Sequence, residues 1–328
     1  MKMSKDIYFN NNYGLLYEKI ENGASTVFEL KTKNGTVKNL FLKRKAPSVN
    51  GQDYYEIITP YGYGGAVIED LTGDKNELVK EYEQAFSEYC KEQNIVCEFV
   101  RFHPIVNNAK DFESVYSPIF SRKTLGTNLV DFEDPIASEF SKSTRKKIRK
   151  ALNSGVTYVI DENPSNLDEF KEVYYATMDR NNAADYYYFG DEYFENVLKF
   201  FKDNTITCKA VLDGKTIAMG LYFISDGILH IHLSGTFSEY LHLSPAVVLR
   251  FGVCEWAIKN GYKLIHHGGG RTNDPEDSLY TFKKNFAQNT EFDFYIAKKI
   301  WNKDAYNAIC ENEGVDSNAD FFPAWRSR

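Results

Sequence analysis

Residues 264–286 read LIHHGGGRTNDPEDSLYTFKKNF, an apolar stretch that ends in three glycines and continues through an acidic loop into an aromatic, lysine-bearing segment. Gly268, Gly269 and Gly270 carry no Cβ, so another group can approach the backbone closely where the strand ends. Lys283 and Lys284 follow a short distance beyond. Cations beside an accessible backbone suit a site for an anion or a developing oxyanion. The same letters also suit a flexible surface loop with solvated lysines, and this stretch alone leaves both interpretations open.

The composition is that of a globular protein with room for two domains. The 328 residues carry 43% hydrophobic and 26% charged side chains and a net charge of −7. This charge argues against nonspecific coating of nucleic acid, although a local basic patch could still hold one. The five widely spaced cysteines predict reduced, mostly buried thiols. MKMSKDIYFNNN at the N-terminus has no apolar core and no run reaches membrane-spanning length, so we expect a soluble cytoplasmic protein without a membrane span.

Both halves of the chain show strands joined by tight turns, a helix and a further strand. In the first half the strands are expected at 25–30, 37–42, 54–59 and 95–102, with a helix at 76–93. In the second half helices are expected at 166–178 and 191–201, and two Asp-Gly turns separate strands at 206–212, 216–224 and 228–234. Ser244 and Pro245 suit the N-cap and first position of a helix that Gly261 ends, before a strand at 263–267.

A basic segment lies between the halves. Ser143–Lys150 holds five cations in eight residues, and Phe140, Ile148 and Leu152 could form a narrow apolar stripe. The pattern predicts a basic amphipathic helix. Its charged side is either an ordinary solvated surface or an anchor for phosphate, on a nucleotide or on RNA.

Recognisable hydrolytic or metal chemistry is scarce. No G-x-S-x-G elbow, H-E-x-x-H or P-loop lysine occurs. His230, His232, His266 and His267 could form a metal pair, but half-buried histidines in an aromatic sheet are the commoner outcome, so we expect no metal. The carboxylates around Asp277 indicate loop and capping acids. What remains is a glycine-rich strand end with tyrosines and lysines, which suits acyl transfer to an amine nucleophile.

Two stretches resemble the FemABX-type aminoacyltransferases. These are HLSGTFSEYLHLSPAVVLRFGVCEWAIKNGYKLIHHGGG at 232–270 and DSLYTFKKNF at 277–286. Arg101–Pro104 and Ser143–Lys150 also match segments of the family, and the similarity extends over roughly residues 50–290. The resemblance implies an α+β (mixed α/β) fold of two tandem GNAT-like acyltransferase domains, each a mixed sheet flanked by helices. We place these domains at 1–135 and 136–309, with a tail at 310–328 that packs back on the first.

By the same resemblance, Lys283 would stabilise the transition state or hold the 3′ end of a tRNA, with Phe282 beside it as a second catalytic residue. Arg180 would grip a substrate phosphate, and Tyr61–Gly65 with Asp70 would line the first-domain side of a cleft. The resemblance also implies roles in substrate binding for His232, Gly269 and Gly270. The full set of implied substrate-binding residues is Arg180, Tyr61, Tyr63, Asp70, His232, Gly269 and Gly270. The long helical arm of some family members is absent.

The implied reaction moves an amino acid from aminoacyl-tRNA to an amine of a peptidoglycan or other cell-envelope precursor, in a monomer without a cofactor. Acyl-CoA is the alternative donor, with an amino sugar or other amine as acceptor. The segment before Pro245, SEYLHLS, has no glycine to cradle a pyrophosphate, and proline removes one backbone donor, which disfavours CoA. A catalytically silent binding protein of the same fold is the third possibility.

Overall fold

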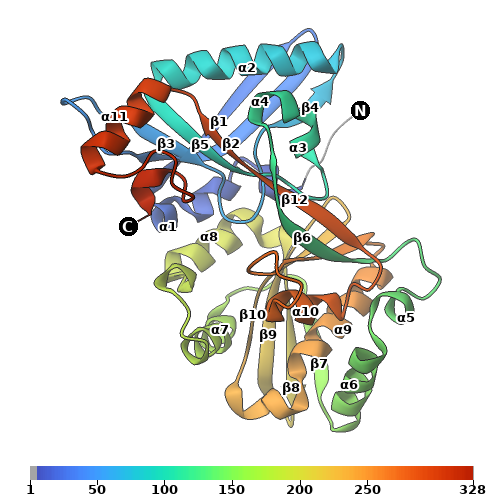
Figure 1. The fold of residues 1–328 in the computed structure, drawn as a ribbon. Helices are drawn as coiled ribbons and strands as arrows, with labels where there is room; N and C mark the ends of the chain where they lie inside the picture. The colour runs from blue at the N-terminus through green and yellow to red at the C-terminus, as the bar shows by residue number, and fades with distance from the viewer. Residues whose placement is uncertain (1–5, 328) are drawn as a thin grey trace. The chain divides into compact units, whose positions relative to one another are not determined.

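The computed structural model describes residues 6–327, which form two compact units. Unit 1 consists of Met1–Ser121 and Asp293–Arg328, and unit 2 consists of Arg122–Phe292. The first five residues, on which the expectation about a signal peptide partly rests, lie outside the described part. Figure 1 shows the elements along the chain.

Unit 1 is built on a mixed sheet. Its strands are β1 (Gly23–Thr32), β2 (Gly35–Lys45), β3 (Tyr55–Ile58), β4 (Val67–Leu71), β5 (Ile95–Arg101) and β12 (Glu291–Ile300). They run in the order β1-β2-β3-β5-β12, and β4 pairs with β2. β3 and β5 are parallel, whereas β1–β2, β2–β3 and β5–β12 are antiparallel.

Helices and a buried aromatic core complete unit 1. The helices are α1 (Glu18–Glu21), α2 (Lys75–Glu92), α3 (Asn108–Asp111), α4 (Glu113–Tyr116) and α11 (Lys303–Glu313), with short 3-10 turns at Ile7–Phe9, Tyr13–Leu16 and Ala324–Arg326. α2 lies across the sheet (Figure 1) and buries Leu78, Tyr82 and Phe86 against it, as the apolar spacing of this segment predicts. α11 packs against Val96 and Cys97, near the start of β5.

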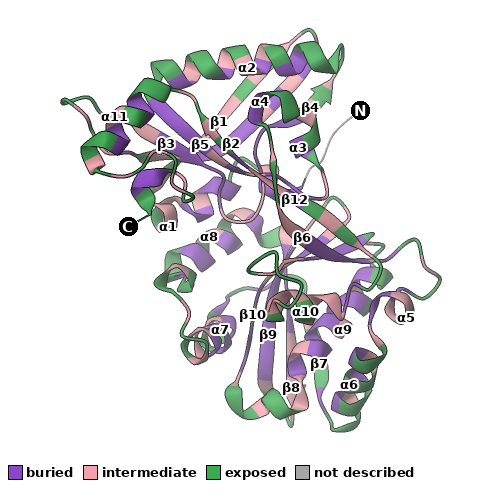
Figure 2. Ribbon diagram, viewed as in Figure 1, coloured by how far each residue is buried: buried purple, intermediate pink, exposed green. Residues whose placement is uncertain are grey.

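Unit 2 also contains paired strands of mixed direction. Its strands are β6 (Ile119–Asn128), β7 (Thr157–Asp161), β8 (Thr205–Leu212), β9 (Lys215–Ser225), β10 (Ile228–Thr236) and β11 (Leu264–Gly269). The order is β6-β11-β10-β9-β8-β7, in which only the β10–β11 pair is parallel. The expected meander forms, and both of its turns use positive φ angles, 49° and 76° at Asp213-Gly214 and 49° and 77° at Asp226-Gly227. Figure 2 shows the buried residues concentrated on these central strands.

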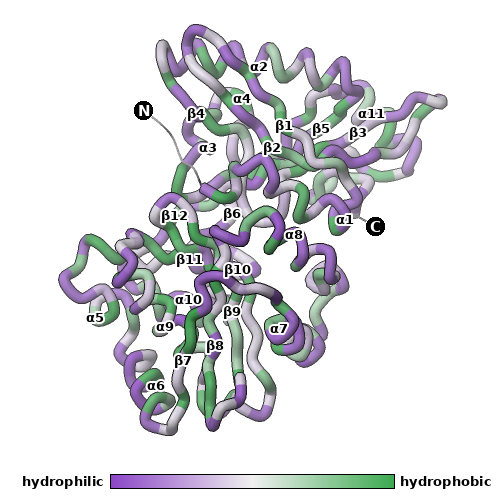
Figure 3. Tube along the Cα trace, turned by 180° about the vertical axis from the view of Figure 1, so that it is seen from behind, coloured by the Kyte–Doolittle hydropathy of each residue, from purple (hydrophilic) through white to green (hydrophobic). Residues whose placement is uncertain are grey.

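The helices of unit 2 flank this sheet. They are α5 (Pro135–Glu139), α6 (Lys142–Asn153), α7 (Asp168–Arg180), α8 (Asp191–Phe201), α9 (Pro245–Lys259) and α10 (Ser278–Lys284), with 3-10 turns at Asp185–Tyr187, Lys202–Asn204 and Ser238–Leu243. α9 packs on the sheet side formed by Ile206, Cys208 and Ala210, and α6 packs on α9. The expected basic helix is present as α6, and hydrophilic residues predominate along it (Figure 3).

The N-cap prediction at Ser244 is wrong in its detail. Helix α9 does begin at Pro245, but Ser244 adopts a left-handed conformation with φ of 55°, and its side chain caps no amide. At this angle the residue reverses the chain after the preceding 3-10 turn instead of presenting its hydroxyl to the helix. Gly261, with φ of 72°, follows the helix end as expected. All five cysteines are buried free thiols, which confirms the expectation for them.

The unit boundaries differ from those expected, because strand pairing and not local pattern decides them. The change of unit lies at 121/122 and not at 135/136, since β6 pairs with β11. The chain returns to unit 1 at 292/293 and not at 309/310, because Ile296–Ile300 pair with Cys97–Arg101 of β5. The tail beyond residue 310 continues this return, and the indole of Trp325 donates a hydrogen bond to Glu56 at 2.7 Å.

Candidate functional site

The glycine-rich strand end and the lysine-bearing helix come together in unit 2. Helix α10 starts after Asp277, whose Oδ1 accepts hydrogen bonds from the amides of Leu279 and Tyr280, both at 2.9 Å. Its Oδ2 accepts from the amides of Arg271 and Thr272 at 3.0 and 3.2 Å. The hydrogen bonds from these amides lower the pKa of Asp277, and the one from Tyr280 has the largest effect. One carboxylate therefore ties the acidic loop to the start of the helix, so this segment is not a flexible loop.

Lys283 lies at the end of α10 and turns its amine toward β11. Its Nζ donates a hydrogen bond to the carbonyl oxygen of Gly269 at 2.6 Å, and the side chain is only partly exposed. Burial lowers the pKa of Lys283 to about 7, and the positive charges of Arg250 and Arg122 lower it further, against an opposing effect of Asp277. The amine is thus shared between its charged and neutral forms at neutral pH. The neighbouring Lys284 instead faces the Glu291 carboxylate at 3.4 Å.

A series of buried hydrogen bonds leads from Arg250 to a residue that follows the C-terminal end of α10. Arg250 of α9 donates to Nδ1 of His267 at 2.7 Å, since a guanidinium has no acceptor. Burial and the Arg250 charge hold the pKa of His267 well below its usual value, so the neutral ring carries its proton on Nε2. Nε2 lies 2.8 Å from the hydroxyl of Thr127, which donates to the carbonyl oxygen of Phe286 at 2.6 Å. This series of hydrogen bonds ends at Phe286, a buried residue just after α10.

Phe282 packs against Arg250. The Arg250 guanidinium carbon lies 5.1 Å from the ring centroids of both Phe282 and Phe286, and these rings are 5.4 Å apart. Such cation–π contacts partly compensate a buried cation. The described contacts of Phe282 are therefore packing contacts that fix the position of Arg250, and its expected catalytic role stays a prediction.

The space beside the glycines is filled by the chain itself. A Cβ on Gly269 would lie 2.8 Å from the carbonyl oxygen of Lys123, and one on Gly270 would lie 2.9 Å from Asp277 Oδ1 and from Tyr280 Cβ. Gly268 has φ of 71° at a bulge in the β6–β11 pairing. The close approach that the three glycines predict is thus made by neighbouring strands and the loop, and a substrate is not needed to explain these residues.

Arg180 and His232 lie elsewhere in unit 2. Arg180, in the last turn of α7, donates to the carbonyl oxygen of Thr236 at 2.5 Å. His232 Nε2 lies 2.5 Å from the Tyr193 hydroxyl, its ring lies 4.5 Å from that of Phe223, and burial lowers its pKa to about 3. The described contacts of His232 are packing contacts between α8 and the sheet. Neither residue makes a described contact with Lys283.

The three positions predicted in the first half do not form one group. Tyr61 and Tyr63 join an aromatic cluster of unit 1: Tyr13 donates to the Tyr61 carbonyl at 2.9 Å, and the Tyr63 ring lies 5.3 Å from that of Tyr8. Asp70 instead pairs with Thr36 in the β2–β4 ladder and is exposed at the hairpin end. The described contacts of Asp70 and of the two tyrosines thus lie in different parts of unit 1, and their expected common lining of a cleft stays a prediction.

Two residues of this site, Arg250 and Thr127, were missed by sequence reasoning, and His267 was considered only as a metal ligand. Arg250 did leave a signal, because it is a single cation inside the apolar run PAVVLRFGV of α9. A charge at a position that periodicity would bury needs a compensating environment and is often functional. Thr127 leaves no comparable signal, since its role depends on pairing between β6 and β11.

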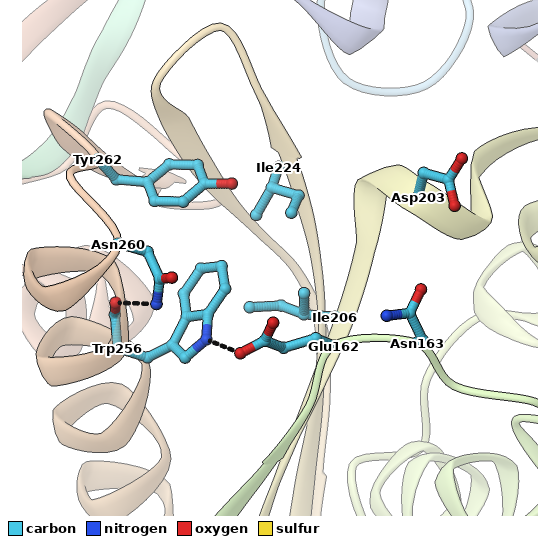
Figure 4. Close-up of a pocket in the computed structure, with 8 residues that line it drawn as sticks. All are labelled: Glu162, Asn163, Asp203, Ile206, Ile224, Trp256, Asn260 and Tyr262. Atoms are coloured by element: carbon cyan, nitrogen blue, oxygen red, sulfur yellow. Dashed lines mark hydrogen bonds between the residues drawn. The ribbon is translucent and has the colours of Figure 1, made fainter.

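A separate hollow of unit 2 shares no residue with the Lys283 site. It has a volume of about 300 Å³ and is lined by Glu162, Asn163, Asp203, Ile206, Ile224, Trp256, Asn260 and Tyr262 (Figure 4). The Trp256 indole donates to Glu162 at 2.7 Å across it. With two carboxylates and no cation in its lining, this hollow is unsuited to a phosphate-bearing ligand.

Comparisons with known proteins point to one group. Residues 138–284 match the family described as Acetyltransferase (GNAT) domain. A curated relative from Weissella viridescens, UDP-N-acetylmuramoylpentapeptide-lysine N(6)-alanyltransferase, is 23% identical over 150 residues, which is 45% of this chain and 44% of the relative. The match thus spans less than half the length of that relative.

Solved structures share the fold at low sequence identity. FemX aligns with a TM-score of 0.68 over 93% of this chain and 94% of its own, at 13% identity. The C-terminal domain of a putative lysylphosphatidylglycerol synthetase from Agrobacterium fabrum aligns with a TM-score of 0.58 over 91% and 88%, at 14% identity. Within residues 6–327, none of the helices combines the length and apolar character needed to cross a bilayer. The chain therefore has the fold of FemX, and its residues 138–284 are similar to a GNAT acetyltransferase domain.

Proposed function

We propose that this chain transfers an aminoacyl group from aminoacyl-tRNA to an amine of a peptidoglycan or other envelope precursor in the cytoplasm. The observation that carries the proposal is the amine of Lys283, partly buried at the end of β11 and held 2.6 Å from the Gly269 carbonyl. The name of the Weissella relative supports the acceptor class, since it specifies a lysine N6 amine of a UDP-N-acetylmuramoyl pentapeptide. We accordingly infer a peptide amine as the first acceptor to test.

The proposed reaction forms one bond and breaks one. The acceptor nitrogen bonds to the aminoacyl carbonyl carbon, the ester bond to the ribose oxygen breaks, and a proton passes from the nitrogen to that oxygen. Negative charge develops on the carbonyl oxygen in between. Because the pKa of Lys283 is lowered to about 7, a nearby oxyanion would draw a proton onto its amine. The attraction would then be stronger in the transition state than in the bound substrate, as catalysis requires.

The start of α9 supports tRNA over CoA as the donor. A GNAT enzyme cradles the CoA pyrophosphate on amides at the start of the corresponding helix. Here Pro245 contributes no N–H, and the amide of Val247 already donates to the Ser244 carbonyl at 3.1 Å. Two of the first three amides are therefore unable to bind a pyrophosphate. No further cofactor is invoked in this proposal, which treats the protein as a monomer.

A transfer assay tests the proposal. Purified protein is mixed with tRNA charged with radiolabelled alanine and with UDP-N-acetylmuramoyl pentapeptide containing lysine, and labelled peptide is followed. We expect transfer by the native chain and a loss of at least 100-fold in Lys283→Met, as for removal of an oxyanion-stabilising group. Lys284→Met, which removes the adjacent ammonium, serves as the matched control and should retain most activity.

Parallel reactions with other donors distinguish the alternatives. Acylation of an amine by acetyl-CoA or a longer acyl-CoA, with no transfer from charged tRNA, would replace the proposal by the CoA-dependent alternative. Precursor binding without turnover of either donor would indicate the catalytically silent protein. Full activity of Lys283→Met would remove Lys283 from the reaction.

A further inference from the structure

Helix α6 presents a band of cations to solvent. At 100° per residue, Lys142, Lys146, Arg149 and Lys150 fall within an arc of about 100°, and Lys147 lies about 60° beyond it. All five are exposed, whereas Thr144, Ile148 and Ala151 on the opposite side are buried. Figure 2 shows this division as an exposed outer side and a buried inner side of α6. We call the band formed by the five cations the α6 basic face.

The α6 basic face carries no compensating charge. None of its five side chains forms an ion pair or hydrogen bond with any residue between 6 and 327, although the chain as a whole is acidic, with a net charge of −7. The sixth cation of the helix, Arg145, is used internally and donates to the carbonyl oxygens of Ala137 and Phe140. Five uncompensated positive charges on three turns of helix attract a polyanion.

The start of this helix is joined to the end of α10. The amide of Ser141 donates to the carbonyl oxygen of Asn285 at 2.9 Å, and the Ser141 hydroxyl donates to Asn285 Oδ1 at 2.9 Å. The same hydroxyl caps α6 by accepting from the Thr144 amide at 3.2 Å. Asn285 follows Lys283 by two residues. The α6 basic face therefore begins beside the segment that carries the reactive lysine and extends about 12 Å from Lys142 to Lys150.

The chemistry of the face distinguishes two polyanions. A helix that lies on a membrane inserts large apolar side chains between the lipids. In α6 the apolar residues Ile148 and Ala151 are buried against α9, and the exposed arc holds only cations and small polar groups. Nothing on this side could enter a bilayer. Phosphodiester contacts need no insertion, because exposed lysines and arginines neutralise phosphates at the surface.

We propose that the α6 basic face binds the phosphodiester backbone of the donor tRNA near its 3′ end and so directs the aminoacyl ester toward Lys283. The identification of the RNA rests on the proposed function, whereas the polyanion site rests on α6 itself. Contacts of this kind fix the register of an RNA without reading its sequence. The face would therefore accept different tRNA bodies, and selection of the amino acid would occur elsewhere.

The test compares two quadruple variants with equal loss of charge. The face variant combines Lys142→Gln, Lys146→Gln, Arg149→Gln and Lys150→Gln. The control combines Lys202→Gln, Lys215→Gln, Lys259→Gln and Lys263→Gln, four exposed lysines of unit 2 that lie outside α6. All eight side chains are exposed, so both variants should keep the native melting temperature. Binding of uncharged tRNA is measured by fluorescence anisotropy between 50 and 200 mM salt.

The expected result is a change in salt dependence confined to the face variant. Each lost phosphate contact lowers the slope of log Kd against log salt by about 0.7–0.9, so four contacts lower it by about 3. The face variant should bind at least tenfold more weakly at 100 mM salt, and the control should match the native chain. A variant of the native chain that keeps the charge, with Lys142→Arg, Lys146→Arg and Lys150→Arg, should show the native slope.

The outcomes separate this inference from the proposed function. If native protein binds tRNA and the face variant keeps the native slope, the α6 site is refuted while tRNA remains the donor. If native protein binds no tRNA, the donor assignment and the inference both fail. If the face variant loses binding to vesicles of phosphatidylglycerol but not to tRNA, the face is a membrane contact.

Discussion

Replacing Lys283 by methionine should make the protein more stable while abolishing transfer. The unfolded chain holds a proton on this lysine up to a pKa of about 10.4, whereas the native state holds it only up to about 7. Between these values the unfolded state binds more protons, so native stability rises with pH. The lowered pKa costs about 4 kcal/mol at pH 7 and about 2 kcal/mol at pH 9 by this linkage.

Methionine keeps a flexible apolar stem of similar length and has no charge to bury. The hydrogen bond to Gly269, about 1 kcal/mol, is lost. We therefore expect Lys283→Met to be more stable than the native chain by about 3 kcal/mol at pH 7, with the advantage smaller by about 2 kcal/mol at pH 9. Reactive groups held in unfavourable surroundings commonly show this trade between stability and activity.

Urea unfolding at pH 7, 8 and 9 measures the difference directly. Lys284→Met is the control, since it removes the adjacent ammonium and with it the ion pair to Glu291, worth up to about 1 kcal/mol. The reasoning is refuted if Lys283→Met is less stable than the native chain at pH 7. It is refuted equally if its difference from the native chain is constant from pH 7 to 9.

Three further variants test the packing and electrostatics of the two units. Thr127→Val should lose about 2 kcal/mol in urea unfolding, because a buried imidazole N–H and a buried carbonyl oxygen lose their partner, and Thr127→Ser should restore it. Gly235→Ala should cost more than about 2 kcal/mol, since its Cβ would lie 2.3 Å from the Val173 carbonyl oxygen, whereas Gly190→Ala, with nothing within 4 Å, should change little. Burial raises the pKa of Glu98 to about 7, so native stability falls as pH rises from about 4 to 7. The stability of Glu98→Gln relative to the native chain should therefore increase by about 2.5 kcal/mol from pH 5 to pH 8.

Local signals in the sequence predict the elements of this fold well. Asp-Gly pairs define both turns of the β8–β9–β10 meander, because aspartate and glycine tolerate the positive φ angles that such turns require. Proline and glycine likewise mark the two ends of α9. These signals act over a few residues. The unit boundary at 292/293 depends on pairing of β12 with β5, almost two hundred residues earlier, and no local pattern encodes that pairing.

The sequence singled out Lys283 as a candidate but did not reveal the surroundings of its amine. The resemblance singles out Lys283, and the position of this residue in α10 agrees with a site at the end of β11. The lowered pKa is a property of burial and of two arginines from other elements, so the segment 277–286 alone could not reveal it. For Asp70 the expected role stays a prediction. Proximity in sequence to Tyr61 and Tyr63 suggested a shared lining, but an extended strand separates residues by about 3.3 Å each.

Arg250 explains why the positive potential at Lys283 persists in a buried place. Its described contacts are a neutral imidazole and two aromatic rings, and they include no carboxylate. A carboxylate partner would stabilise the guanidinium but would also cancel its field at the lysine. Burial lowers the pKa of Arg250 only to about 10, so the residue stays charged at neutral pH. Burial above all, and then the charge of Arg250, keep the pKa of Lys283 low. An oxyanion formed there would meet the positive charge of Arg250 and, once protonated, that of Lys283, with only the Asp277 carboxylate opposing them.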